Sequence, residues 1–204
     1  MDLSLFPRGL AIGLAIAAPV GPIGVLCIRR SLTDGRSVGL ATGLGAATAD
    51  ALYAALAALG LTAIGQALSD QADLIRLVGG LALCLLGIKT VRAAPVAVAA
   101  SSGGRAQLAG AYATTIGLTL ANPATILSFA AVFAGLGAAR GDGGSAFLLV
   151  LGVFLGSALW WLILSGGVGL LRGRVTSTAL RWINGGSGAI LIGFGGLALF
   201  AALR

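Results

Sequence analysis

The chain has 204 residues, of which 58% are hydrophobic and only 9% are charged, and its formal net charge is +7. A mean hydropathy of +1.04 excludes an ordinary soluble domain and indicates an integral membrane protein. Its partner is then the lipid bilayer. The basic residues lie singly or in pairs between apolar runs, so the positive charge indicates membrane orientation and not nucleic-acid binding.

The residue types exclude several other functions. Histidine is absent, and Cys27 and Cys84 are isolated in apolar surroundings, so we expect no metal site, no disulfide framework and no cofactor. Serine hydroxyls have no histidine to activate them, and the glycine-rich pieces lie inside apolar runs and do not follow a strand. We therefore expect no enzymatic activity.

Six apolar stretches follow one another along the chain, and they predict an all-α, polytopic membrane protein with six transmembrane helices. They fall at about 4–28, 37–66, 74–92, 107–138, 144–171 and 180–203. The first, third and fifth connecting segments hold nine of the thirteen basic residues: Arg29, Arg30, Arg36, Lys89, Arg92, Arg105, Arg172, Arg174 and Arg181. By the positive-inside rule these segments face the cytoplasm, which places both termini outside the bacterial cytoplasmic membrane.

The first apolar stretch contains a helix-breaking sequence, Ala18-Pro19-Val20-Gly21-Pro22. Two prolines delete backbone donors and clash with the preceding turn, so the span should be interrupted near its middle. Broken backbone at membrane depth is tolerated only where it is buried in protein or lines a cavity. Half-helix ends of this kind often form the binding site of a transporter, so we predict that Pro19, Val20, Gly21 and Pro22 contact the solute.

Asp50 is the one acidic residue in the middle of a predicted span. A charged side chain there costs roughly 3 kcal/mol on insertion scales and is by default a functional residue. A buried carboxyl group can take up and release a proton, which makes Asp50 the candidate for proton coupling. The alternative is a structural residue that hydrogen-bonds across a helix interface, to Thr48, Thr42 or Asn122.

A second polar break, Asn122-Pro123, lies in the fourth span. Proline should free the carbonyl one turn back, near Thr119, and the Asn122 amide can both donate and accept. An asparagine that only caps a kinked helix is the alternative. A free amino acid suits two such breaks, because its carboxylate favours a half-helix N-terminus such as 21–24 and its ammonium favours free carbonyls and Asp50.

The two halves of the sequence resemble each other. Residues 13–19 align without a gap on 117–123, and Asp50-Ala51-Leu52-Tyr53 aligns with Ser157-Ala158-Leu159-Trp160. Each half has an odd number of spans, so the second crosses the membrane in the opposite sense and the pattern predicts two inverted repeats of three helices. We expect one repeat at 1–92, a flexible cytoplasmic linker at 93–106, and the second repeat at 107–204.

The motifs resemble those of the LysE family of bacterial amino-acid exporters. The resemblance rests on Pro19-Val-Gly-Pro22, residues 28–36, Gly43-Leu-Gly45 with Asp50, Leu120-Ala-Asn-Pro123 and Asn184-Gly-Gly-Ser-Gly188. At the first break many relatives have Pro-Gly-Pro-Asn, whereas this chain has Pro-Val-Gly-Pro-Ile and lacks that asparagine. It implies export of an amino acid or similar small solute driven by the proton-motive force. The broken first helix, Asp50 and Asn122-Pro123 would then lie at the core of the transporter.

Two other classes of membrane protein stay open on the residues alone. A divalent metal-ion exporter would need several carboxylates, thiolates or imidazoles converging in the spans. A channel-like or structural protein would need no coupling residue. The residues also leave open which solute is carried, with a neutral or small polar amino acid slightly preferred. Whether Gly79-Gly80 and 193–196 make helix contacts within one subunit or in a homo-oligomer is open too.

Overall fold

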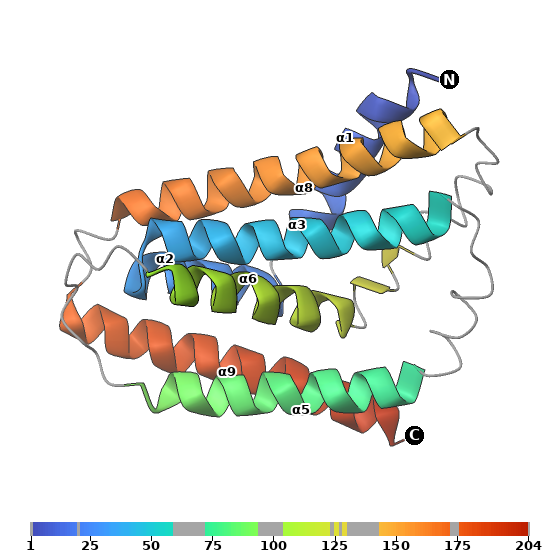
Figure 1. Cartoon of the computed structure of the whole chain (residues 1–204). Coiled ribbons are helices and arrows are strands. Elements are labelled where there is room, and N and C mark those ends of the chain that lie inside the picture. The colour runs from blue at the N-terminus through green and yellow to red at the C-terminus, as the bar shows by residue number, and fades with distance from the viewer. Residues whose placement is uncertain are drawn as a thin grey trace.

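The computed structural model describes residues 2–19, 21–58, 72–93, 104–122, 125–126, 128–129, 143–171 and 176–203. Its regular elements within these ranges are seven α-helices (Figure 1). They are α1 (Leu5–Ala17), α2 (Pro22–Thr33), α3 (Arg36–Ala58), α5 (Ala72–Val91), α6 (Arg105–Leu120), α8 (Gly143–Leu171) and α9 (Ser177–Ala202). The prediction of an all-α protein is confirmed.

Several of these helices can cross a membrane. In the described part of the chain α3, α8 and α9 are long and apolar enough, and α1 with α2 makes a fourth span if this bent pair is counted as one. The predicted spans at 74–92 and 107–138 overlap α5 and α6, and the second of them extends into undescribed residues. The total of six spans therefore stays a prediction.

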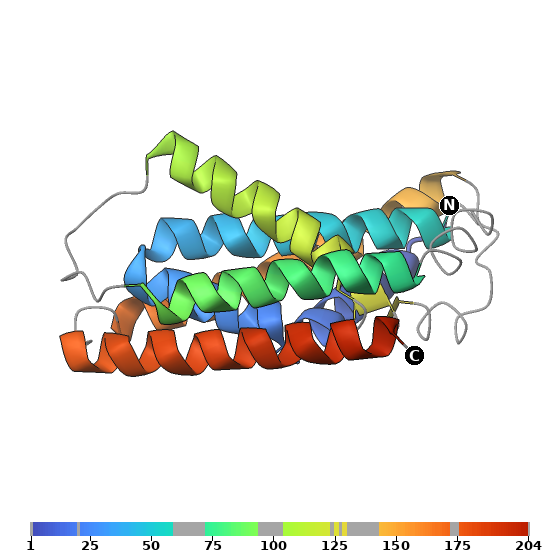
Figure 2. The ribbon, with the colours of Figure 1, turned by 90° about the horizontal axis from the view of Figure 1, so that it is seen from below.

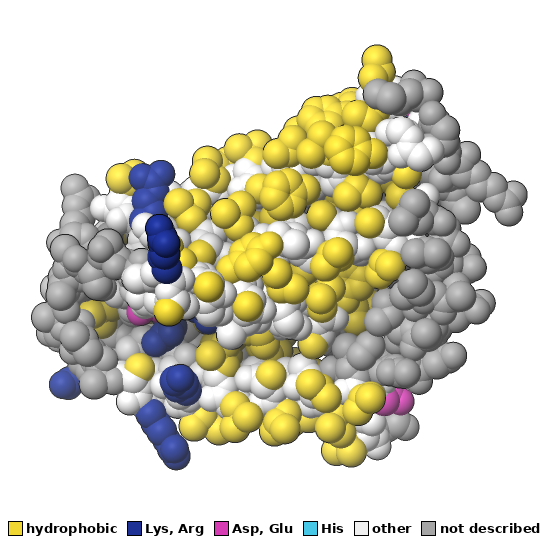
Figure 3. Space-filling view, viewed as in Figure 1, with side chains coloured by type: hydrophobic (Ala, Val, Ile, Leu, Met, Phe, Trp, Pro, Cys, Tyr) yellow, Lys and Arg dark blue, Asp and Glu magenta, His cyan; other side chains and the backbone are white. Residues whose placement is uncertain are grey.

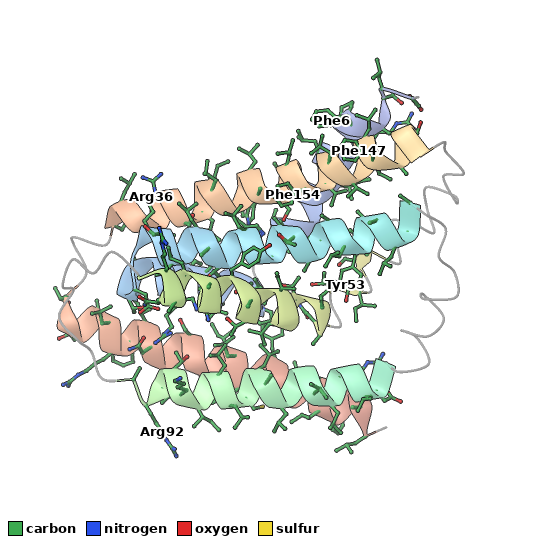
Figure 4. The ribbon with its side chains drawn as sticks, viewed as in Figure 1. Phe6, Arg36, Tyr53, Arg92, Phe147 and Phe154 are labelled. Carbon is green, nitrogen blue, oxygen red and sulfur yellow. The ribbon has the colours of Figure 1, made fainter. Side chains whose placement is uncertain are left out.

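The distribution of apolar and charged side chains on the surface is that of a helical bundle in lipid. Large apolar side chains on the outside of the bundle are exposed, among them Leu85 on α5, Leu162 on α8 and Trp182 on α9. In Figure 3 hydrophobic side chains cover the middle of the visible face, whereas Lys and Arg gather at one end. Arg36 and Arg92 lie at that end, and both chain termini lie at the other (Figures 1 and 4).

Close helix contacts depend on glycine. α1 packs along α8, where a Cβ on Gly13 would collide with the backbone of Val153 and a Cβ on Gly9 would collide with the Leu149 carbonyl. These collisions cannot be relieved by side-chain rotation, because the opposing atoms are backbone. Small residues at these positions therefore let the two helices approach closely, as is usual in membranes.

α5 and α9 form a second tightly packed pair, which runs along one side of the bundle (Figure 2). Gly80 and Gly195 face each other across this contact, and Gly79 faces the backbone of Ala121 at the end of α6. The contacts of these three glycines are thus within one chain. A Cβ on Gly193 or Gly196, in contrast, would meet no described atom within 4 Å.

Arg30, in the last turn of α2, bonds this helix to α3 and α6. Its guanidinium donates at 3.0–3.2 Å to Thr42, Thr114, Thr115 and the Ala111 carbonyl. The neighbouring Arg29 donates through Nε to Oδ1 of Asn184 on α9, at 3.0 Å.

Charge patterning predicts that Arg29 and Arg30 lie in a segment that connects two helices. This prediction is wrong, because both residues lie within α2. α2 continues to Thr33 and turns into α3 at Gly35, whose φ of 108° is a conformation that glycine adopts readily. Two guanidinium groups can lie among helices here because hydroxyl, amide and carbonyl oxygens accept from them. Both arginines lie in the C-terminal part of α2, close in sequence to Arg36 at the basic end of the bundle.

Candidate functional site

The first span is broken where the two prolines predict it. α1 ends at Ala17, α2 begins at Pro22, and the two helix axes differ in direction by 79°. Gly21 is the N-cap of α2, with extended backbone, and Pro22 occupies the first helical position, where its missing N–H costs nothing. The N–H groups of Ile23 and Gly24 have no acceptor within a helix that starts here.

A cavity of about 230 Å³ lies at this break. That volume is several times the roughly 30 Å³ share of one water molecule in the liquid, so the cavity has room for a small solute. α1, α2, α3, α6, α8 and α9 all contribute to its lining. The lining includes Ile16, Ala17, Pro19, Gly21, Pro22, Ile23, Gly24, Asp50, Thr119, Asn122, Trp161 and Phe194.

Asp50 enters this cavity from α3. Its side chain is only 3% exposed, and its Oδ2 accepts a hydrogen bond of 2.7 Å from the hydroxyl of Ser157 on α8. Ser157 Oγ in turn accepts a hydrogen bond of 3.1 Å from Nε1 of Trp161, one turn further along α8. The carboxylate is thus the end of a short hydrogen-bonded chain that starts at an indole.

Two of the structural partners expected for Asp50, Thr42 and Thr48 on its own helix, hydrogen-bond to other groups. Thr42 Oγ1 donates to the Val38 carbonyl and Thr48 Oγ1 donates to the Leu44 carbonyl, each four residues back on α3. Threonine in a helix commonly bonds in this way, because its hydroxyl lies beside that carbonyl. The partner that the structure gives to Asp50 is Ser157.

The end of α6 also lines the cavity, through Thr119 and Asn122. Ala121 N–H donates to the Gly117 carbonyl and Asn122 N–H donates to the Thr119 carbonyl, so the expectation that the Thr119 carbonyl is free is wrong. The chain tightens into a final turn at this point and so uses the carbonyl itself. The Thr119 hydroxyl, in contrast, is buried and has no hydrogen-bond partner among the described residues.

Most of the predicted site residues therefore come together. Pro19, Gly21, Pro22, Asp50 and Asn122 line one cavity, although they lie on three separate segments of the chain. Val20 and Pro123 lie outside the described residues. Two of the predicted contacts with a solute are thus without a structural description.

Other cavity residues were missed by sequence reasoning. Trp161 and Phe194 are aromatic residues in apolar helices, and nothing in their local sequence separates them from residues that face lipid. Ser157, which is outside the cavity lining but donates to Asp50, had a signal, because the alignment of the two halves pairs it with Asp50. The meeting of two aligned residues is what a pseudo-twofold axis between α3 and α8 would produce.

The described residues contain no group of three or more His, Cys, Asp or Glu side chains that could hold a metal ion. Among the described residues that line the cavity, Asp50 is the only titratable one. The polar groups at the cavity are one carboxylate, one amide, hydroxyl groups and the N–H groups at the start of α2, which have no acceptor among the described residues. This set suits a small molecule that carries both a positive and a negative charge.

Comparison with known proteins gives a consistent result. The sequence pattern of the LysE type translocators matches residues 14–201. A protein of Bacillus subtilis (strain 168) named "Putative amino acid efflux protein YcgF" is 26% identical over 198 residues, which cover 95% of this chain and 94% of that protein. The "Chemotactic transduction protein ChpE" of Pseudomonas aeruginosa is 30% identical over 205 residues, with 97% and 98% covered. No solved structure matches the chain.

Proposed function

Because this chain belongs to the LysE type translocator family, it is a multi-pass membrane transporter and not an enzyme, and we propose that it exports an amino acid or a similar zwitterion. The proposed location is the bacterial cytoplasmic membrane. The proposed driving force is proton antiport, with Asp50 as the coupling carboxylate. The solute class draws support from the relative that is named for amino acid efflux.

The observation that carries this proposal is the place of Asp50. It is a buried acid in a cavity at the break between α1 and α2. An ionisable group inside a span is expensive and is usually kept for function. A carboxylate that binds either a proton or the ammonium of a solute, but not both, couples their opposite movements.

The polar groups around the cavity suit the two ends of a zwitterion. The N–H groups of Ile23 and Gly24 begin α2, where the helix dipole favours a negative charge such as a carboxylate. Asp50 would hold the ammonium. The hydroxyl of Thr119, which has no partner among the described residues, would supply a neutral hydrogen bond to the rest of the solute.

We further propose that 1–92 and 107–204 are inverted repeats joined by the linker 93–106. Helix packing supports this, because α1 packs on α8 whereas α6, its counterpart, packs on α3. The aligned glycines behave alike: Gly45 on α3 faces the backbone of Tyr112 on α6, and Gly152 on α8 faces the backbone of Phe6 on α1. α5 and α9, the third helices of the two halves, pack on each other.

Export in cells tests the proposed function. Cells with and without the protein are fed dipeptides, one amino acid at a time, and the intracellular amino acid is measured. The protein should lower the accumulation of its solute, and a proton uncoupler should abolish the difference. Asp50→Asn should lose export against a gradient but keep exchange of labelled for unlabelled solute, because it mimics the protonated carboxyl.

Asp73→Asn is the matched control for this experiment. Asp73 is exposed at the start of α5 and pairs with Arg76 at 2.8 Å, far from the cavity in sequence and outside its lining. This variant should export normally. Uphill export by Asp50→Asn with unchanged pH dependence would show that Asp50 is only structural, and solute flow that never exceeds equilibrium in the unchanged protein would indicate a channel.

A further inference from the structure

The hydrogen-bonded chain at Asp50 has a fixed direction. The indole N–H of Trp161 can only donate, so Ser157 Oγ must accept from it. The hydroxyl of Ser157 has a single proton, and its other short contact is Oδ2 of Asp50 at 2.7 Å. That proton is therefore directed at the carboxylate, and the order of donation is Trp161 to Ser157 to Asp50.

The two oxygens of Asp50 consequently differ. Oδ2 is occupied by the Ser157 donor, whereas Oδ1 has no hydrogen-bond partner among the described residues. Asp50 lines the cavity and its Oδ2 already accepts from Ser157, so we infer that Oδ1 is the oxygen left for a proton or a solute. A proton on Oδ2 would have to use the second lone pair of that oxygen and would weaken the hydrogen bond from Ser157, so Oδ1 is the favoured site for the proton.

This inference rests on the proposed function. The geometry points to Ser157 and Trp161 as positioning residues that keep Oδ2 of Asp50 engaged in a hydrogen bond. They leave Oδ1 as the one atom that the proton and the ammonium of the solute bind in turn. In the exchange step, the O–H bond at Oδ1 breaks and the proton passes to water. The electron pair stays on Oδ1, which then accepts a hydrogen bond from the ammonium. Because one atom serves both, the two ligands exclude each other.

Neighbouring titratable groups have other partners. Tyr53 on α3 donates through its hydroxyl to the Leu120 carbonyl at 2.6 Å, and Cys27 on α2 donates to the Gly39 carbonyl at 3.5 Å. Arg30 is held by the neutral oxygens of α3 and α6. Among the described residues of α1, α6, α8 and α9 that line the cavity none is titratable, so the pH dependence of exchange at Oδ1 is set by Asp50 and its donor.

The test is the pH profile of gradient-driven export, measured in vesicles with the amino acid identified in cells. Ser157→Ala removes the donor that stabilises the carboxylate, so Asp50 should hold its proton more tightly. The midpoint of the profile should move upward by about one pH unit. Trp161→Phe keeps an aromatic ring but frees Ser157 to turn, so the midpoint should move in the same direction by less. Ser157→Thr keeps a hydroxyl and should restore the original midpoint.

Ser165→Ala is the matched control, because Ser165 is also a buried serine of α8 and donates to the Trp161 carbonyl. It should leave the midpoint unchanged. Suppose that Asp50→Asn stops uphill export but the pH midpoints of Ser157→Ala and Trp161→Phe equal that of Ser165→Ala. The positioning role of Ser157 and Trp161 is then wrong, and the coupling role of Asp50 stands. If Asp50→Asn still pumps, the proposed coupling itself fails. Should one variant not fold, the other still decides.

Discussion

The hydroxyl of Tyr53 donates to the carbonyl oxygen of Leu120 at 2.6 Å, across 67 positions of sequence. Leu120 is the last residue of α6, so its carbonyl has no partner within that helix. The Tyr53 ring also stacks on Phe129, with ring centroids 5.4 Å apart (Figure 4 labels Tyr53). One side chain of α3 therefore holds both sides of the second polar break.

Tyr53→Phe should destabilise the protein by about 1 kcal/mol, because it removes the hydrogen bond and keeps the stacking ring. Thermal unfolding in detergent measures this as a lower melting temperature. Tyr112→Phe is the control, since among the described residues the Tyr112 hydroxyl bonds to the Thr48 hydroxyl in a solvent-exposed pair, whose loss should have little effect. Equal melting temperatures for the two variants would contradict the assigned role of Tyr53.

Gly13 and Gly117 align in the two halves but have different surroundings. A Cβ on Gly13 would meet the Val153 carbonyl, whereas a Cβ on Gly117 would meet no described atom within 4 Å. Gly13→Ala should therefore cost about 1–3 kcal/mol, because α1 and α8 must move apart. Gly117→Ala should be neutral or stabilising, because alanine favours helix. Thermal unfolding of both variants would show whether close packing at this aligned position is found on α1 and not on α6.

Much of the fold could be predicted from the sequence because lipid imposes long apolar helices. The break at Pro19 and Pro22 could be placed to the residue, since proline removes a donor wherever it stands. The end of α2 could not, because Arg29 and Arg30 find acceptors on three other helices. Such long-range acceptors leave no trace in local charge patterning.

The site was predictable only in its chemically unusual residues. Asp50 and Asn122 are polar residues within apolar spans. The free-energy cost of placing a polar side chain in the membrane is enough to single them out. Ser157, Thr119 and Trp161 are ordinary residues for a membrane helix, and their roles depend on which helices meet. The Asp50 to Ser157 contact needed the repeat alignment together with the assumption that aligned residues of α3 and α8 face each other.

The orientation in the membrane can be tested by labelling. In a Cys27→Ala, Cys84→Ala background, we expect a cysteine at Asp73 to react with an impermeant reagent added outside intact cells. A cysteine at Ser37 should be protected until the membrane is opened. Both positions are exposed and lie at opposite ends of the bundle, Ser37 beside Arg36 at the basic end. The reverse labelling pattern would place the basic end outside.

The two prolines of the first break should be jointly required for export. Only residues 18–21 separate α1 from α2, and Pro22 lacks the N–H that would bond to the Ala18 carbonyl in a continuous helix. Pro19→Ala with Pro22→Ala restores that donor, so we expect α1 and α2 to join and the N–H groups of Ile23 and Gly24 to be consumed by helix bonds. Export should be lost, although the apolar chain still inserts.

A single replacement at the break and a replacement of a proline away from it are the comparisons for this double variant. Pro22→Ala alone should keep part of the export, because Gly21 still provides extended backbone and its carbonyl still accepts from Val25. Pro7→Ala is the control, because Pro7 lies in the first turn of α1, where proline is tolerated, and is outside the cavity lining. Export by each variant is compared at equal membrane abundance, and helix content is followed by circular dichroism. Normal export by the double variant would mean that the break shapes the helix but does not hold the solute.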